Sequence, residues 1–401
     1  MIVPARLLLF VFFGLFLAGC SKTRNLLMTP RFNEPGVIKL YYDREGDLYP
    51  PEVHVSPHFF YLAHENRSLR KRKKSPEYAT LESALTRYDS FSHAQIREKY
   101  QLYGTDSVRL YLRLQKQLQN KALEQMEASM QQLGNRHLVI LIHGFNTVQP
   151  DADYYSLRQN ILRRFRVAPT FVEIYWDGLT DLGDNPLTAG IWGKAQTNSV
   201  KVGLGIRYLL SRIGGNTQIT IITHSLGASV ATHALFNPVK WSRSFQEKLE
   251  EEYHSTRIPT PHHEKIVLSM LAPAISGVNI FEDIHNTVPA GAALPLKKLV
   301  IGYNHFDYAV TKGGLFPRSF GSTALGADAK NEVKKTLAVL QRKAPHIETT
   351  TVNFSYRHVP GNDTLSGKQL RSYRQRQHAI LFYERNPWFE TFLDETFGKK
   401  Q

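Results

Sequence analysis

Short apolar runs alternate with amphipathic stretches over the C-terminal two-thirds of the chain. The runs of strand length fall at residues 137–145, 170–176, 218–225, 265–272, 296–304 and 349–356. Helical spacing separates the first three, and a predicted helix at residues 226–236 directly follows the third. A short apolar run of this kind is typical of a buried parallel strand. Strands that alternate with helices therefore predict an α/β fold with a mainly parallel sheet flanked by helices.

The segment before this pattern is different. Residues 21 to about 75 are rich in proline and irregular, with short β-like runs such as residues 36–43. Residues 77–135 have helical spacing and no evident chemistry, so we interpret them as a packing element or cap. The sequence thus predicts an irregular and helical N-terminal extension over residues 20–135 and an α/β domain over residues 136–401.

The first residues indicate export. An apolar run at residues 7–17 follows a basic residue, is too short for an ordinary membrane-spanning helix, and is typical of a secretory signal. The residues Leu17 to Cys20 resemble the lipobox of bacterial lipoproteins. The resemblance implies removal of residues 1–19 and attachment to a membrane of the bacterial cell envelope through lipidated Cys20. Ser21 stands where an aspartate would retain the protein at the inner membrane, which favours the outer membrane.

Composition and charge narrow the class of partner. With 401 residues, 42% of them hydrophobic and 21% charged, the chain has the composition of a folded globular protein. Its net charge of +15 favours anionic partners, either nucleic acid or acidic lipid headgroups. Export argues against nucleic acid, so we interpret the basic run at residues 67–74 as a solvated loop. Cys20 is the only cysteine, which excludes an intramolecular disulfide or a thiolate zinc site.

The strongest chemical signal lies at the carboxyl end of the run at residues 218–225. Ser225 stands in the sequence THSLG, which differs from the nucleophile-elbow pattern G-x-S-x-G because Thr223 takes the first glycine position. The predicted strand, turn and helix would hold the serine hydroxyl above the sheet, and the helix N-terminus favours negative charge there. Ser225 is therefore the candidate nucleophile.

A second motif follows the first strand of the α/β segment. His143 and Gly144 stand in the sequence LIHGFNT, at the end of the first apolar run. Together with HSLG after a later strand, this pair resembles the α/β-hydrolase superfamily over about residues 137–390, and in particular an uncharacterised bacterial branch of it. The resemblance implies the α/β-hydrolase fold and an oxyanion hole formed by the backbone N–H groups of Phe145 and Leu226. We interpret His143 as a support of this loop rather than as a base.

A serine hydroxyl attacks only with the help of a neutral imidazole, which a carboxylate holds in the correct tautomer. The order in the superfamily places the acid and then the histidine after the serine. Asp307, just beyond a late strand, is the preferred acid, with Glu282 and Asp283 as alternatives.

His378 is the preferred base. It precedes the apolar residues 379–383 and a terminal helix expected to start near Pro387, and it resembles the H-S-Y-F/Y-x-x-N-P tail of the bacterial branch. His358, directly at the end of the last strand, is the alternative.

These residues predict a lipid-anchored serine hydrolase that cleaves a small-molecule or lipid ester, with an amide left open, through an acyl-enzyme. The mechanism needs no metal or organic cofactor, and the histidines at residues 261–264 lack a second ligand cluster. The alternative is a non-catalytic envelope protein of the same fold that binds or scaffolds. The sequence predicts neither the acyl length nor the oligomeric state.

Overall fold

The computed structural model describes a defined part of the chain. The described residues are 34, 36–42, 46–49, 107–145, 147, 150–176, 178, 188–236, 266–282, 284, 296–311, 324–355 and 377–399. Several predicted features lie outside them: Cys20 with the apolar run 7–17, the basic run 67–74, the histidines at 261–264, Asp283 and His358. No helix within the described ranges is long and apolar enough to cross a membrane.

The core of the molecule is one sheet with the order β2-β1-β4-β3-β5-β6-β7-β8. Its strands are β1 (Val37–Tyr42), β2 (Leu48–Tyr49), β3 (His137–Ile142), β4 (Thr170–Trp176), β5 (Gln218–His224), β6 (Ile266–Leu271), β7 (Leu296–Tyr303) and β8 (Glu348–Asn353). All neighbouring strands pair in parallel except the short edge strand β2, which is antiparallel to β1. The predicted α/β fold with a mainly parallel sheet is confirmed.

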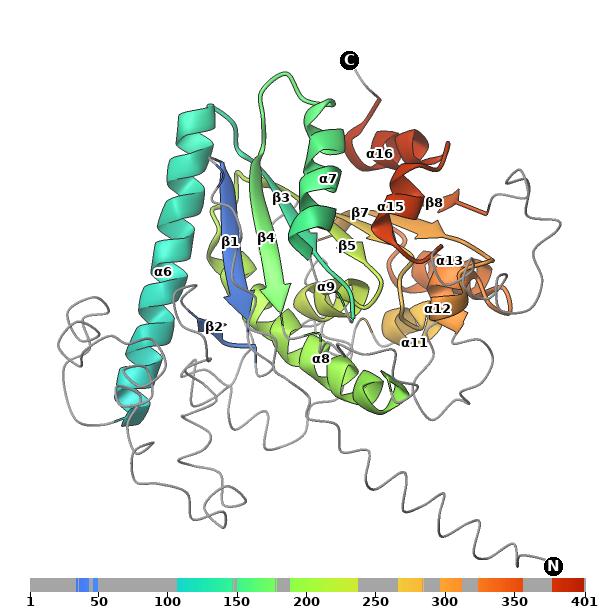
Figure 1. Cartoon of the computed structure of the whole chain (residues 1–401), viewed down its shortest axis with the longest axis horizontal. Helices are drawn as coiled ribbons and strands as arrows, with labels where there is room; N and C mark the ends of the chain where they lie inside the picture. Colours follow the sequence, from blue (N-terminus) through green and yellow to red (C-terminus); the bar gives the residue numbers. More distant parts are fainter. Residues whose placement is uncertain are drawn as a thin grey trace, which may run out of the picture.

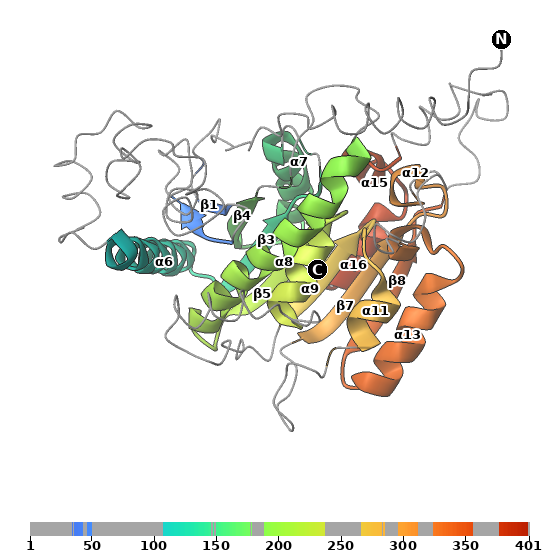
Figure 2. The same cartoon turned by 90° about the horizontal axis from the view of Figure 1, so that it is seen from below.

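Helices cover both faces of this sheet (Figures 1 and 2). The helices whose side chains join the larger buried cluster are α6 (Ser107–Leu133), α8 (Thr188–Arg212), α9 (Gly227–Leu235), α11 (Gly277–Glu282) and α13 (Glu332–Lys343). Those in the second cluster include α7 (Pro150–Leu162), α15 (Ile380–Glu384) and α16 (Phe389–Phe397). The short elements α12 (Tyr308–Thr311) and η4 (Ala324–Ala327) follow β7.

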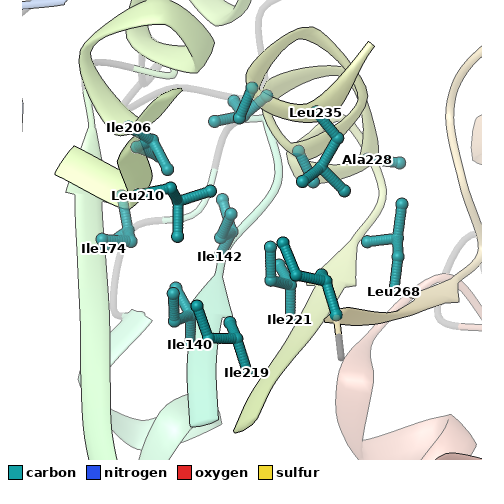
Figure 3. Close-up of a cluster of buried hydrophobic side chains, with 14 of the residues drawn as sticks. Ile140, Ile142, Ile174, Ile206, Leu210, Ile219, Ile221, Ala228, Leu235 and Leu268 are labelled. Atoms are coloured by element: carbon teal, nitrogen blue, oxygen red, sulfur yellow. The ribbon is translucent and has the colours of Figure 1, made fainter. Parts of the chain in front are cut away.

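Branched aliphatic side chains fill the space between the sheet and the helices α8 and α9. Ile140, Ile174 and Ile221 rise from three neighbouring strands toward Ile206 and Leu235 on the helices (Figure 3). Each of these side chains is almost completely buried. Because the central strands are covered on both faces, their side chains are apolar in succession rather than in alternation, which is why the sequence shows continuous runs.

Two elements of the predicted N-terminal extension belong to this same core. Strand β1 pairs in parallel with β4 along its whole length, and α6 buries Met126 and Met130 against the same cluster. Glu34 also forms a bidentate salt bridge with Arg158 of α7, with N–O distances of 2.6 and 2.9 Å. The sheet therefore includes strand β1, which lies before residue 136 in the sequence. β1 pairs with the edge of β4, and the sequence pattern does not reveal this long-range pairing.

Candidate active site

Ser225 lies at the tight turn between β5 and α9. It has a φ of +54°, in the left-handed region that residues other than glycine rarely adopt. Two backbone hydrogen bonds fix this turn: the Ser225 N–H donates to the Leu271 carbonyl, and the Ala274 N–H donates to the Ser225 carbonyl, both at 3.0 Å. A strained residue persists only where its surroundings hold it, and such residues concentrate at functional sites. The surrounding structure therefore holds this turn in a strained conformation, as is typical of a functional site.

Two glycines allow the close approach of β3, β5 and α9 around this serine. A Cβ atom on Gly144 would lie 2.7 Å from the Ser225 Cβ and 3.2 Å from its Oγ. A Cβ atom on Gly227 would lie 2.5 Å from the Ile142 carbonyl oxygen. Both distances are too short for any side chain, so the His-Gly pair and the second glycine of the elbow are steric requirements.

Thr223, in the first glycine position of the elbow pattern, lies within β5. It pairs with Ile142 of β3 and Met270 of β6, and it is buried. Its hydroxyl has no hydrogen-bond partner among the described residues, but its β-branched shape suits a strand. The strained backbone falls at Ser225, so this position does not require a glycine.

The structure brings the three predicted polar side chains into one chain of hydrogen bonds. The Ser225 Oγ lies 2.8 Å from the His378 Nε2, and the His378 Nδ1 lies 2.7 Å from the Asp307 Oδ2. Because a carboxylate only accepts, Nδ1 carries the proton and Nε2 is left to accept the serine hydroxyl. Ser225 follows β5, Asp307 follows β7, and His378 precedes α15. The contacts thus join residues that lie far apart in the sequence.

Asp307 is completely buried, and its carboxylate is well satisfied. The Val310 N–H donates to Oδ1 at 3.1 Å, and the Tyr383 hydroxyl donates to Oδ2 at 3.1 Å. Burial by itself would raise the pKa of Asp307, but the charge of His378 and the hydrogen bonds from His378, Val310 and Tyr383 hold that pKa below its usual value. Asp307 is therefore anionic at neutral pH, as a partner of an imidazole must be.

The alternative acid within the described residues lies elsewhere. Glu282, at the end of α11, forms ion pairs with Arg342 and Lys343 of α13. The Glu282 carboxylate therefore belongs to these partly exposed surface ion pairs and contacts neither Ser225 nor His378.

His143 holds the loop that follows β3. Its Nδ1 donates to the Gly144 carbonyl at 2.8 Å, and its Nε2 accepts the Trp176 N–H at 3.2 Å. Burial lowers the pKa of His143 to about 4, so the ring is neutral, and it stacks on Trp176 with ring centroids 5.6 Å apart. With both ring nitrogens engaged, His143 acts as a structural support, in agreement with its interpretation from the sequence.

The same contact orients the Phe145 amide. The Gly144 carbonyl, which also accepts the Thr147 hydroxyl at 3.3 Å, belongs to the same peptide unit as the Phe145 N–H. In a trans peptide the two groups point in opposite directions, so the N–H points away from His143. Neither the Phe145 amide nor the Leu226 amide has an acceptor among the described residues. Leu226 directly follows Ser225, and Phe145 follows Gly144, whose backbone lies close to the Ser225 side chain.

No cluster of three or more His, Cys, Asp and Glu side chains that could hold a metal ion occurs within the described residues. The groups of the site described above are a hydroxyl, an imidazole, a carboxylate and backbone amides.

Comparisons with known proteins add little to this description. No family model and no curated protein matches the chain. A solved carboxyl esterase of metagenomic origin is similar over 54% of this chain, with 16% sequence identity and a TM-score of 0.20. The match covers 49% of the esterase, so it spans about half of that chain's length. The fold assignment rests on the structure itself: a mainly parallel sheet flanked by helices, with a strained serine at the turn between β5 and α9, is an α/β-hydrolase fold.

Proposed function

We propose that this protein is a serine hydrolase of carboxylic esters, anchored to a membrane of the bacterial cell envelope through lipidated Cys20. The observation that carries the proposal is the hydrogen-bonded series of Ser225, His378 and Asp307, with distances of 2.8 and 2.7 Å. These separations meet the geometric requirement for a nucleophile, its general base and the group that orients the base. The serine turn places the hydroxyl where the carboxyl ends of the strands meet.

The first half of the reaction follows from these contacts. The His378 Nε2 accepts the hydroxyl proton while the Ser225 Oγ attacks the ester carbonyl, and a tetrahedral intermediate forms. Asp307 then faces an imidazolium, whose charge its buried carboxylate stabilises. His378 returns the proton to the leaving alcohol as the carbon–oxygen bond breaks, which leaves the acyl group on the Ser225 Oγ.

The second half repeats these roles with water. His378 deprotonates a water molecule that attacks the acyl-enzyme, and it then protonates the Ser225 Oγ as the acid departs. In both halves the Phe145 and Leu226 amides stabilise the oxyanion, and each donor of this kind is typically worth about 3 kcal/mol. Their lack of acceptors among the described residues supports this role.

A fluorophosphonate probe tests the nucleophile. We expect the probe to label the wild-type protein and Ser225→Ala to abolish both labelling and the hydrolysis of p-nitrophenyl esters. Ser229→Ala is the matched control, because Ser229 is also buried and also contacts a histidine, at 3.4 Å from the His233 Nδ1. A wild-type protein that resists the probe and hydrolyses no ester would instead favour a non-catalytic, binding role for the fold.

Metabolic labelling with palmitate tests the anchor. We expect the full-length protein to incorporate palmitate and to sediment with membranes, and Cys20→Ala to abolish both. Incorporation that persists in Cys20→Ala would refute the lipid anchor without affecting the catalytic proposal.

A further inference from the structure

His224, directly before the serine, makes a contact that the reaction steps above do not use. It is the last residue of β5, is buried, and places its Nε2 2.6 Å from the backbone carbonyl oxygen of His378. Its ring also lies beside the His378 ring, with centroids 4.8 Å apart, and faces the Tyr383 ring at 6.4 Å. His224 therefore fills the space between the catalytic candidates and α15.

The chemistry of this hydrogen bond is fixed by its acceptor. A carbonyl oxygen only accepts, so the His224 Nε2 carries a proton and donates. Burial lowers the pKa of His224 to about 3, and electrostatic repulsion between the His224 and His378 rings when both are protonated adds to this effect. The ring consequently stays neutral across the pH range of ester hydrolysis. A neutral ring is also what the site requires, because a second positive charge would oppose the imidazolium that forms on His378.

The last residue of β5 and the first residue after it therefore both contact His378. The Ser225 Oγ contacts its imidazole, and the adjacent His224 contacts its backbone carbonyl. Two other hydrogen bonds lie near Asp307. The Tyr383 hydroxyl donates to Asp307, and the Asn304 side-chain amide donates to the Gln377 side-chain oxygen at 3.3 Å. Of these contacts, only the hydrogen bond from His224 connects β5, which ends next to Ser225, to the backbone of His378.

We propose that His224 is a positioning residue for the reaction, which fixes the distance and angle between the His378 imidazole and the Ser225 hydroxyl by holding the His378 carbonyl. This inference rests on the proposed hydrolase function. Its physical basis is that His378 lies outside a regular element, so its backbone is fixed by individual contacts. A displacement of about 1 Å between reacting groups can cost about 10²-fold in rate.

Substitutions of His224 separate the donated hydrogen bond from the packing of the ring. His224→Leu fills the space but cannot donate, whereas the longer amide of His224→Gln can reach the carbonyl and His224→Asn cannot. His233→Leu is the matched control, because His233 is likewise buried and neutral and donates to one backbone carbonyl, that of Ser229 at 2.6 Å. It lies on α9 and contacts no member of the catalytic cluster.

Steady-state kinetics on a p-nitrophenyl ester are the main readout. We expect His224→Leu to lower kcat by about 10- to 100-fold with KM nearly unchanged. We expect His224→Gln to recover most of this loss, and His233→Leu to keep the wild-type kcat while lowering Tm. Equal kcat values for His224→Leu and His233→Leu would overturn the proposal. If His224→Leu does not fold, the test is the comparison of kcat between His224→Gln and His224→Asn. Equal kcat values for these two variants would also overturn the proposal.

A measurement without substrate keeps this inference distinct from the hydrolase proposal. The His378 Nδ1 proton, hydrogen-bonded to Asp307, is expected to give a far-downfield proton NMR signal while the cluster is ordered. Loss of this signal in His224→Leu but not in His233→Leu supports the positioning role even if the wild-type protein hydrolyses no ester. An unchanged signal in His224→Leu overturns it, whatever the activity.

Discussion

Replacement of Asp307 by asparagine is the most informative single change in the candidate site. It preserves the size and shape of a completely buried side chain and removes only its charge and one acceptor oxygen. Among the described residues, three groups donate to the carboxylate: the Val310 N–H to Oδ1, and the His378 Nδ1 and the Tyr383 hydroxyl to Oδ2. An asparagine places an oxygen at one of the two carboxylate oxygen positions and an NH2 group at the other. The donors that face the NH2 group must therefore change their hydrogen bonding.

The structure predicts which way the amide turns. The Val310 N–H cannot move its proton, and an NH2 group facing it would leave a buried donor unsatisfied at a cost of about 1–3 kcal/mol. His378 can shift its proton from Nδ1 to Nε2, and the Tyr383 hydroxyl can rotate. We therefore expect the amide oxygen to face Val310 and the NH2 group to face His378. In that state the His378 Nε2 carries a proton and cannot accept the one on Ser225.

The expected consequence is a large loss of activity with little loss of stability. In a serine, histidine and aspartate triad, trapping the wrong tautomer lowers kcat by about 10⁴-fold, which corresponds to about 5 kcal/mol of transition-state stabilisation. The assay is kcat/KM on a p-nitrophenyl ester, together with the rate of fluorophosphonate labelling of Ser225. Thermal unfolding provides the control for folding.

Two results would refute this reasoning. A kcat/KM within about tenfold of the wild-type value would mean that Asp307 does not set the tautomer of His378. An equal loss in Glu282→Gln, whose carboxylate lies in the surface ion pairs with α13, would mean that charge near the site matters more than the specific contact.

The remaining predictions concern the surroundings of the site. Tyr383→Phe removes one donor to Asp307 and should lower kcat/KM by about tenfold, measured as above, with the buried ring still packed. Gly144→Ala places a Cβ atom 2.7 Å from that of Ser225 and should lower kcat by about 10²-fold; wild-type turnover in this variant would contradict the described turn. Acid should destabilise the fold, because buried histidines such as His233, whose pKa falls from 6.5 to about 4, bind a proton only after unfolding. The free energy of unfolding in urea should therefore fall as pH drops from about 6.5 to about 4, by up to about 3 kcal/mol for this residue, and His233→Leu should show a shallower dependence.

The sequence predicted the strands and the order in which the chemistry appears. The runs that form β3, β5 and β7 are apolar because helices cover both faces of the sheet. The local composition of the sequence therefore indicates where these strands lie. The elbow around Ser225 is also local, since a strand, a tight turn and a helix follow one another there. These features depend on neighbours within a few residues, which a sequence pattern contains.

Only the tertiary structure decided which distant groups meet. Strand β1 has no local feature that assigns it to the edge of β4, and nothing near His224 in the sequence indicates that it donates to the carbonyl of a residue at the other end of the domain. The choice of Asp307 over Glu282 likewise depends on the side chains that face each carboxylate. Hydrogen bonds require a separation near 3 Å, and only the order of strands in the sheet brings such residues that close.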